Sequence, residues 1–108
     1  MKKSIVVTAR CPIRTTMELL GGKWKLLVLF QLRNGALRTS ELKRCIPDIS
    51  EKMLIQELKT LVIQQLVNRH DFREQPPRVE YSLTEKGKAA LPLIEQMKHF
   101  ATTYEELS

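Results

Sequence analysis

The sequence predicts a mainly α-helical domain of the α+β class that contains one small β-hairpin. Three observations support this prediction. Apolar residues recur at helical spacing through most of the chain, glycines and prolines separate these stretches, and residues 78–83 alternate between polar and apolar side chains. A chain of 108 residues, of which 43% are hydrophobic, has enough material for one hydrophobic core and too little for two. We therefore expect a single domain over residues 1–108.

Helices before residue 39 are predicted from periodicity and from the residues that end them. Residues 1–10 lack periodicity and are expected to form a loose arm. The segment PIRTTMELLGG predicts a short helix that ends at its glycines, with Met17, Leu19 and Leu20 turned inward. The segment KWKLLVLFQLRNG is apolar around nearly its whole circumference. Its length and flanking glycines favour a central buried helix over a buried strand.

Residues 39–63 predict two helices joined by a tight turn. Thr39 or Ser40 can cap the first, SELKRCI, which Pro47 ends because the residue before a proline avoids the helical region. Ser50 is expected to cap the second, longer helix. This arrangement is a helix-turn-helix.

The second of these helices has two different faces. At about 100° per residue its apolar side chains share one arc, which contains Leu54, Ile55, Leu58, Leu61 and Val62. The opposite arc contains Lys52, Gln56, Glu57, Lys59 and Thr60, with Met53 and Ile63 among them. Lysine can contact DNA phosphates or guanine, and glutamine can contact adenine. An ordinary solvated helix face has the same composition, so this helix alone does not establish DNA binding.

The segment at residues 66–83 predicts an antiparallel hairpin with strands at residues 66–72 and 78–83. Prolines stiffen its tip, which Arg73 and Arg78 flank. A helix-turn-helix, a hairpin and a final helix follow one another in the order of a winged helix-turn-helix domain. We therefore expect the two arginines to approach an adjacent DNA groove, where a narrow minor groove concentrates negative potential. A solvent-exposed turn is the alternative.

The segment at residues 84–107 predicts a helix that kinks or restarts at Pro92. Beyond this proline an apolar stripe recurs at helical spacing, formed by Leu93, Met97, Phe100 and Tyr104. Such a stripe needs a covering surface. Either the domain's own first helix or a second copy of the chain can supply it.

Charge and cysteine content limit the possible functions. The net charge is +6, and basic residues dominate residues 1–44, which suggests a nucleic-acid partner, although a solvated basic surface is an equal alternative. No apolar run is long enough to span a bilayer, and the one near the N-terminus is too short for a signal peptide. We therefore expect a cytoplasmic protein without a membrane partner. The cysteines and histidines lack the spacing of metal ligands, so neither a metal nor a cofactor is expected.

Three stretches, CPI…LLGGKWKLLVL, LRTSELKRCIPDISEKMLIQELKTL and PPRVEYSLTEKGKAALP, resemble the HxlR family of bacterial transcription regulators, which is related to the MarR-like winged-helix proteins. The resemblance extends over residues 10–104. It implies a homodimer that is held by the first and last helices. It also implies that the helix from Ser50 lies in the DNA major groove, and that a wing near residues 72–78 contacts the DNA backbone or minor groove.

The helix pattern and this resemblance together assign candidate contacts. The candidates on the groove helix are Ser50, Lys52, Met53, Gln56, Lys59 and Thr60. The candidates for phosphate and wing contacts are Arg38, Arg73 and Arg78. The candidate dimer interface is the stripe of Leu93, Met97, Phe100 and Tyr104.

Several characterised members of this family sense electrophiles or oxidants through a cysteine at the position of Cys11. Arg10 and Arg14 flank it, and positive charge favours the reactive thiolate. A small, partly buried residue at a helix start is an equal alternative. Cys45 is expected to be buried, and it is displaced by one residue from the second cysteine of disulfide-forming members. This displacement weakens a switch built on both thiols.

Two positions depart from the family pattern. An aromatic residue is common where Thr39 stands, so looser packing is expected under the short helix. Glycine is usual where Gln65 stands, and a non-glycine residue there must adopt a left-handed conformation at some strain or form another turn.

These observations predict a dimeric, sequence-specific DNA-binding regulator that recognises an inverted repeat. One alternative is a winged-helix module that binds protein or RNA without reading DNA sequence. An enzyme with Cys11 as nucleophile needs a base and an oxyanion site nearby. His70 and His99 are not obviously placed to serve such a site, so we expect no enzymatic activity.

Overall fold

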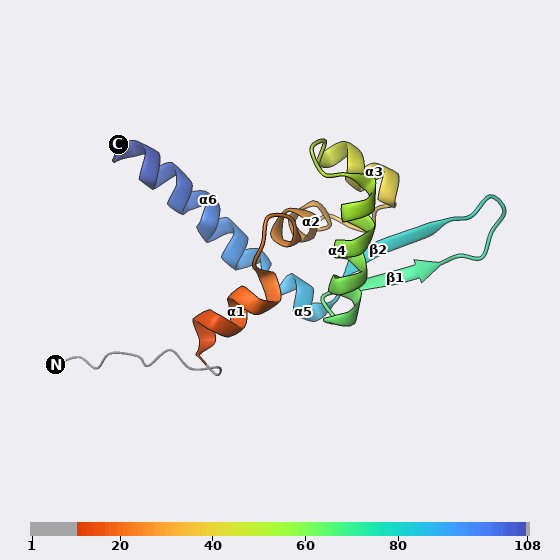
Figure 1. Cartoon of the computed structure of the whole chain (residues 1–108), viewed down its shortest axis with the longest axis horizontal. Helices are drawn as coiled ribbons and strands as arrows, with labels where there is room; N and C mark the ends of the chain where they lie inside the picture. Colours follow the sequence, from red (N-terminus) through yellow and green to blue (C-terminus); the bar gives the residue numbers. More distant parts are fainter. Residues whose placement is uncertain (1–10, 108) are drawn as a thin grey trace.

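The computed structural model describes residues 11–107, so the arm expected at residues 1–10 lies outside the described part of the chain. Four helices come first (Figure 1), namely α1 (Pro12–Leu20), α2 (Lys25–Gln31), α3 (Thr39–Cys45) and α4 (Glu51–Ile63). They are followed by strands β1 (Val67–Asp71) and β2 (Val79–Leu83) and by helices α5 (Glu85–Lys88) and α6 (Leu91–Glu106). The predicted mainly helical fold with one hairpin is confirmed.

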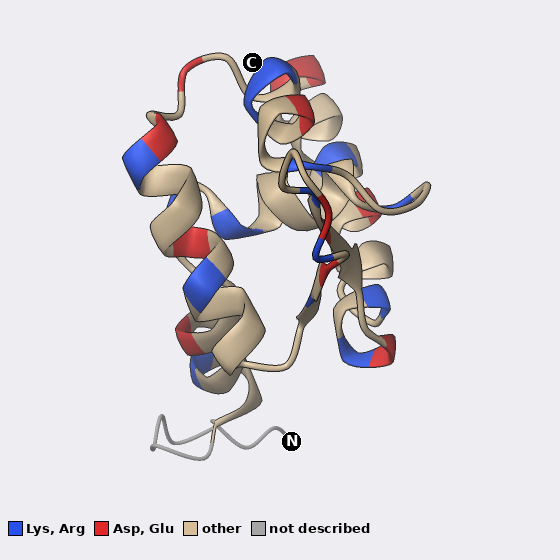
Figure 2. Cartoon of the chain, turned by 90° about the vertical axis from the view of Figure 1, so that its right-hand side faces the viewer, with Lys and Arg blue, Asp and Glu red and all other residues tan. Residues whose placement is uncertain are grey.

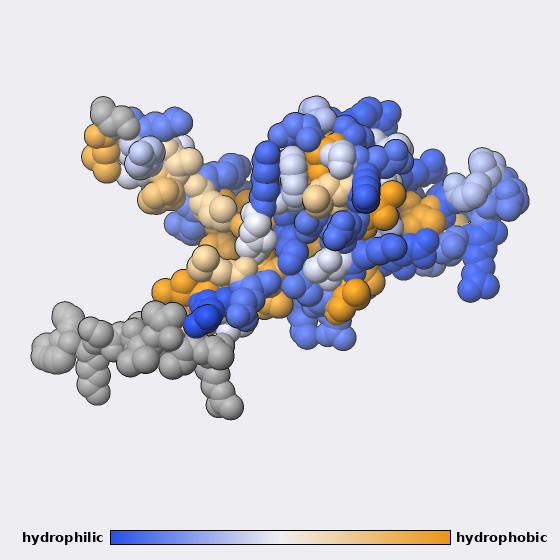
Figure 3. Space-filling view, viewed as in Figure 1, coloured by the Kyte–Doolittle hydropathy of each residue, from blue (hydrophilic) through white to orange (hydrophobic). Residues whose placement is uncertain are grey.

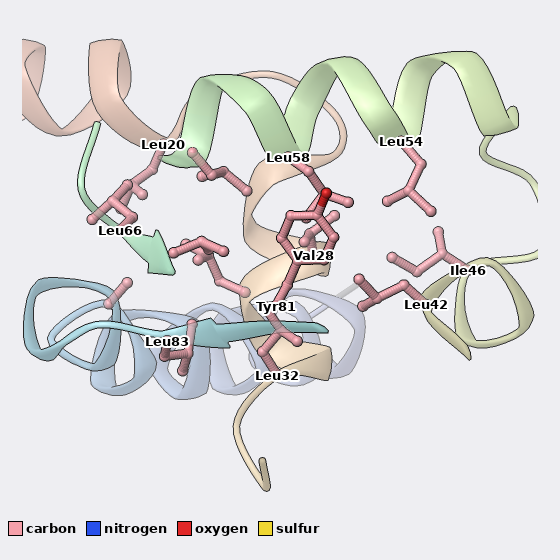
Figure 4. Close-up of a cluster of buried hydrophobic side chains, with 14 of the residues drawn as sticks. Leu20, Val28, Leu32, Leu42, Ile46, Leu54, Leu58, Leu66, Tyr81 and Leu83 are labelled. Atoms are coloured by element: carbon pink, nitrogen blue, oxygen red, sulfur yellow. The ribbon is translucent and has the colours of Figure 1, made fainter. Parts of the chain in front are cut away.

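Helix α2 lies at the centre of the hydrophobic core, as its all-round apolar sequence predicts. Val28 and Leu29 are fully buried, and side chains from α3, α4 and β2 close around this helix (Figure 4). These surrounding residues include Leu42, Leu54, Leu58, Leu61, Tyr81 and Leu83. Burial of an aliphatic side chain of this size stabilises a fold by roughly 1.5–3 kcal/mol. The core therefore holds α3, α4 and the hairpin in fixed relative positions.

Helix α1 buries less of its apolar face than the sequence predicts. Leu20 is buried, whereas Met17 is 66% exposed and Leu19 is 40% exposed, so the predicted inward orientation of these two residues is wrong for the single chain. The reason is geometric, because α1 projects away from the body of the domain (Figure 1). Its exposed apolar side is therefore available to another surface.

The base of the hairpin is tied to the segment that leads into α3. In the antiparallel ladder Val67 lies opposite Leu83. Tyr81 and Leu83 are buried and Val79 is half-buried, which confirms the predicted apolar face of β2. Leu37 exchanges two backbone hydrogen bonds with Tyr81, at N–O distances of 2.9 and 2.8 Å. The hairpin and the helix-turn-helix therefore form one rigid unit.

Side-chain hydrogen bonds fix the starts of α3 and α4. The hydroxyl of Ser50 accepts a hydrogen bond from a backbone N–H in the first turn of α4 at 3.0 Å, which confirms the predicted cap. The cap of α3 is Arg38, so the expectation of a cap at Thr39 or Ser40 is wrong. Helix α3 begins earlier because the carboxylate of Glu41 reaches back and accepts the N–H of Arg38 at 2.8 Å.

The turn between α4 and β1 places Gln65 in the left-handed region, with a φ of 63°. The N–H of Leu66 donates to the carbonyl of Leu61 at 2.9 Å, which closes the end of the helix. The hydroxyl of Thr84 donates to the Gln65 carbonyl at 2.6 Å, and the ammonium of Lys86 donates to the Gln65 side-chain oxygen at 3.0 Å. Of the two outcomes expected at Gln65, the structure has the left-handed conformation, and two contacts tie this turn to the start of α5.

The C-terminal region restarts as a second helix rather than continuing with a kink. Helix α6 begins at Leu91 with Pro92 in its first turn, where a proline is tolerated. Ile94 is the buried residue of α6, and the rest of the helix projects from the body of the domain (Figure 1). None of the helices within residues 11–107 is long and apolar enough to cross a membrane.

Candidate nucleic-acid interface

One face of α4 is buried in the core and the other is open to solvent. The buried face consists of Leu54, Leu58 and Leu61. Lys52, Gln56 and Lys59 are exposed on the side where the helical pattern places them. Three long polar side chains therefore line about two turns of the helix.

Ile55 lies at the edge of this exposed face, so its predicted place in the buried arc is wrong. Its side chain is 41% exposed, although Leu54 and Leu58 are fully buried. The buried arc of α4 is narrower than the sequence pattern predicts, because the core meets the helix along a single row of leucines. Ile55 is therefore an apolar neighbour of Gln56 and Lys59 that the sequence analysis missed.

Three other predicted contacts on this helix have limited reach. Met53 and Thr60 are half-buried beside the exposed face, and Met53 packs against the core. The hydroxyl of Thr60 donates to the carbonyl of Gln56 at 3.2 Å, within the helix. Ser50 is exposed, but its hydroxyl is engaged in the helix cap. These three side chains therefore flank the exposed face rather than form its centre.

Acidic residues follow basic ones along α4 and the hairpin (Figure 2). Glu51 is exposed in the first turn of α4, where it stabilises the positive end of the helix dipole. Arg38 and Arg44 are exposed at either end of α3, and Arg44 is a basic residue that the sequence analysis did not single out as a contact. Lys43 instead donates to the carbonyl of Pro47 at 2.9 Å and so stabilises the turn between α3 and α4.

The two predicted wing arginines have different environments. Arg78 lies between Glu74 and Glu80, at N–O distances of 3.7 and 3.4 Å, and its guanidinium stacks on the ring of Phe72. The 3.4 Å approach is an ion pair without hydrogen-bond geometry, since the Nε of Arg78 has no hydrogen-bond partner among the described residues. Arg73 is exposed and takes part in no ion pair within residues 11–107. Arg73 is therefore the more accessible of the two.

The two cysteines are free thiols in opposite environments. Cys11 is buried directly before α1 and borders a hollow of about 400 Å³ that Arg14 also lines. Cys45 is exposed at the end of α3, so its predicted burial is wrong. Leu42 and Ile46 occupy the inward positions of this segment and turn Cys45 outward. In the part of the chain that the structure describes, no group of three or more His, Cys, Asp or Glu could hold a metal ion.

The apolar stripe of α6 is exposed along its length. Its members are Leu93, Met97, Phe100 and Tyr104, and the rings of Phe100 and Tyr104 stack with 6.2 Å between their centroids. Ile13 and Met17 form a second exposed apolar face on α1. Figure 3 shows hydrophobic surface on both of these projecting helices, on either side of the notch between them. Apolar side chains gathered on exposed helix faces in this way are typical of protein interfaces.

A helix-turn-helix with an exposed polar face, tied to a hairpin that follows it directly, defines a winged helix-turn-helix domain. In helix-turn-helix folds the second helix of the unit lies in the major groove of DNA. Residues 19–108 match the sequence model of the HxlR-like helix-turn-helix family, and the chain belongs to that family. The resemblance found in the sequence is thereby confirmed.

Individual relatives agree with this assignment. The HTH-type transcriptional regulator YkvN from Bacillus subtilis (strain 168) is 48% identical over 96 residues, which cover 89% of this chain and 81% of YkvN. A crystal structure of a MarR-family transcriptional regulator from Porphyromonas gingivalis W83 is similar with a TM-score of 0.88 and 45% identity, over 92% of this chain and 97% of that one. The redox regulator HypR in its oxidised form has a TM-score of 0.80 and 36% identity, over 86% of this chain and 96% of HypR. The chain is a transcriptional regulator of the helix-turn-helix type.

Proposed function

We propose that this regulator binds an inverted-repeat DNA operator as a homodimer, with α4 of each copy in a major groove. The observation that carries the proposal is the exposed row of Lys52, Gln56 and Lys59 on a helix whose start is capped and whose opposite face is fixed in the core. Because the backbone of this helix is already fixed, binding does not have to order it, and the entropic cost of association is lower. Membership of a helix-turn-helix family of transcriptional regulators supports DNA as the partner.

The side chains of α4 divide between base and phosphate contacts in this proposal. The amide of Gln56 pairs with an adenine edge, since a side-chain amide matches the donor and acceptor of adenine in the major groove. Lys52 and Lys59 contact phosphates or guanine. Met53 and Thr60, which flank the exposed face, contact the walls of the groove.

Phosphate contacts on either side of α4 fix its orientation. Arg38 and Ser50 anchor the DNA backbone near the starts of α3 and α4. The exposed side chain of Arg73 reaches from the wing into the adjacent groove. Arg78 adds positive charge to the wing and also positions its tip, because it is held between two glutamates and against an aromatic ring.

The proposed dimer forms through α1 and α6. Its support is the exposed apolar surface on both helices, with Phe100 69% exposed and Met17 66% exposed in the single chain. A two-fold dimer buries the same patch on both copies. In this arrangement the two copies of α4 lie roughly 34 Å apart, one turn of DNA, and the operator has matching two-fold symmetry.

A response to oxidants or electrophiles through Cys11 is the second part of the proposal. It is supported by the likeness to HypR, which is described as a redox regulator. Cys11 directly precedes α1, so modification of its thiol changes the packing of a helix that the proposed dimer uses. Cys11 is buried but borders the hollow that Arg14 also lines, so this hollow is the proposed route of a reagent to the thiol.

Selection from a library of random double-stranded DNA by the purified full-length protein tests this function. Enrichment of one short inverted repeat is the expected result, and release of that repeat by diamide in the wild type but not in Cys11→Ser is expected for the redox response. Enrichment of no sequence would contradict the operator proposal and favour a protein- or RNA-binding winged-helix module. Equal release from wild type and Cys11→Ser would contradict the role of Cys11 alone.

A further inference from the structure

Two isoleucines of α4, Ile55 and Ile63, are exposed, unlike the other apolar residues of this helix. Leu58 points into the core (Figure 4) and is fully buried, and Val62 is half-buried against the core. The exposed fraction is 41% for Ile55 and 81% for Ile63. Both isoleucines therefore present apolar surface that an approaching molecule can cover.

Ile55 lies among the polar side chains of the exposed face of α4. At 3.6 residues per turn it is rotated by about 40° from Lys59 and by about 60° from Lys52, and it directly precedes Gln56. These three polar neighbours are exposed. A single exposed isoleucine is common on protein surfaces and does not by itself indicate a contact. Its position between a base-reading amide and two cations is what links Ile55 to DNA.

The position of Ile55 along α4 also favours contact with a base. In helix-turn-helix proteins the residues near the N-terminus of the second helix contact base edges. Ile55 is in the second turn of α4, close to the capped start at Ser50. Ile63 ends the helix, about 12 Å further along its axis. Of the two exposed isoleucines, Ile55 is therefore the one within reach of the bases.

Thymine is the base whose major-groove edge matches an isoleucine. It presents a C5-methyl group there, whereas the edges of the other three bases are hydrogen-bond donors and acceptors. Contact between this methyl group and an aliphatic side chain removes apolar surface of both from water. A β-branched side chain in a helix has one strongly preferred rotamer, so Ile55 loses little conformational freedom when it makes such a contact.

We propose that Ile55 is a specificity-determining residue that packs against the C5-methyl group of a thymine in each half of the operator. This inference rests on the proposed function, because it requires α4 to lie in the major groove. The Cα atoms of Ile55 and Gln56 are about 3.8 Å apart, close to the base-pair spacing of about 3.4 Å. The thymine therefore lies within about two base pairs of the adenine that Gln56 contacts.

Replacement of thymine by deoxyuridine tests the contact without any change to the protein. Deoxyuridine keeps the base pairing and the O4 acceptor of thymine and lacks its methyl group. Fluorescence anisotropy of the selected operator is measured with the thymines of one half-site replaced one at a time. At one position the affinity should fall by about fourfold, as expected for the loss of one buried methyl group. Unchanged affinity at every thymine would overturn the proposal.

Variants of α4 then assign the methyl contact to a side chain. Ile55→Ala should bind the thymine and deoxyuridine operators equally, because alanine is too short to reach the methyl group. Ile55→Gln should lose the thymine preference as well, and it replaces the alanine variant if circular dichroism shows that variant to be misfolded. Ile63→Ala, on the same face at the end of α4, is the matched control and should keep the fourfold preference.

A purely structural role of Ile55 gives a different result. If the side chain only packs within the domain, Ile55→Ala and Ile55→Gln weaken binding to both operators by the same factor and leave the thymine preference intact. That result would overturn the proposal. A methyl-sensitive thymine more than two base pairs from the position whose preference Gln56→Ala relaxes would overturn the placement beside Gln56.

The same experiments separate this inference from the proposed function. If the selection enriches no inverted repeat, the proposed function fails and the role of Ile55 fails with it. If an inverted repeat is enriched and bound, but its thymines show no preference that depends on Ile55, the proposed function stands and the inference is overturned.

Discussion

The guanidinium carbon of Arg78 lies 3.7 Å from the ring centroid of Phe72, and this contact closes the tip of the wing. Phe72 directly follows β1 and Arg78 directly precedes β2, and the N–H of Phe72 donates to the Arg78 carbonyl at 2.9 Å. A cation over an aromatic face contributes about 0.5–1 kcal/mol at an exposed site. The contact therefore gives Arg78 a structural role that Arg73 does not have.

Substitution of the two wing arginines should separate these roles. Arg73→Ala should flatten the slope of log K against log salt concentration by about one unit, because one phosphate contact is lost. Arg78→Ala should also speed hydrogen exchange of the hairpin amides, because the tip loses its packing against Phe72. Binding measured by fluorescence anisotropy over a range of salt concentrations and hydrogen exchange by NMR check these outcomes. An unchanged salt slope in Arg73→Ala would contradict its assignment to DNA.

Gln56→Ala should relax base preference at one position of the operator. A bidentate side-chain contact discriminates between bases by about 1–3 kcal/mol, and alanine cannot supply it. Lys59→Ala should weaken binding to operator and random DNA by similar factors and reduce the salt slope, because a phosphate contact carries no sequence information. Competition assays with single-base operator variants measure both effects. Equal losses on operator and random DNA for Gln56→Ala would contradict its proposed role.

Ser50→Ala should lower the free energy of unfolding by about 1 kcal/mol, because it removes the side-chain cap of α4. Urea denaturation followed by circular dichroism measures the change. Ser40→Ala is a matched control, since Ser40 is exposed within α3 and does not cap it. Equal stability of the two variants would show that the Ser50 hydroxyl does not stabilise the helix. The assay does not require DNA and so tests the scaffold alone.

Gly87→Ala should destabilise the domain by about 1–3 kcal/mol. A Cβ atom at this position would overlap the backbone carbonyl oxygen of Leu66, which cannot move aside as a flexible side chain can. Helix α5 would then have to separate from the turn before β1, where Lys86 and Gln65 are in contact. Thermal or urea unfolding of Gly87→Ala beside Lys88→Ala, an exposed neighbour, checks the prediction. Two variants of equal stability would rule out the close approach.

Phe100→Asp should convert the proposed dimer into a monomer and abolish operator binding, because it places a charge in the apolar stripe of α6. Sedimentation velocity measures the oligomeric state. Thr102→Asp introduces the same charge on α6 outside the stripe and should remain dimeric. A wild-type protein that sediments as a monomer at micromolar concentration would contradict the dimer itself. If Phe100→Asp remained dimeric, the dimer interface would not include the apolar stripe of α6.

The elements that the sequence predicts well are those that depend on local chemistry. Ser50 caps α4 because a serine before a helical apolar pattern satisfies a free N–H within three residues. The turn at Gln65 is different, because only the family resemblance drew attention to it, and its left-handed conformation is one of the two outcomes left open there. Alternation in β2 likewise predicts the burial of Tyr81 and Leu83. For Ser50 and for β2, neighbouring residues along the chain carry this information.

The wrong predictions concern residues whose burial depends on how much of each helix contacts the core in the folded domain. Ile55 has the right spacing for burial, but the core contacts α4 along a narrower line. Cys45 is turned outward because Leu42 and Ile46 take the inward positions, a choice that the spacing alone leaves open. Met17 is exposed because α1 leaves the body of the domain.

The pairing of Leu37 with Tyr81 separates the part of the wing that sets its direction from the part that forms its tip. Because two backbone hydrogen bonds join the middle of β2 to the segment before α3, the angle between the wing and α4 is set before the chain reaches the tip. Residues 73–77, which lie beyond the contact between Phe72 and Arg78, can therefore vary in length and charge without redirecting α4. Exchange of this tip between related regulators should transfer a preference for flanking DNA while the central sequence preference stays with the recipient.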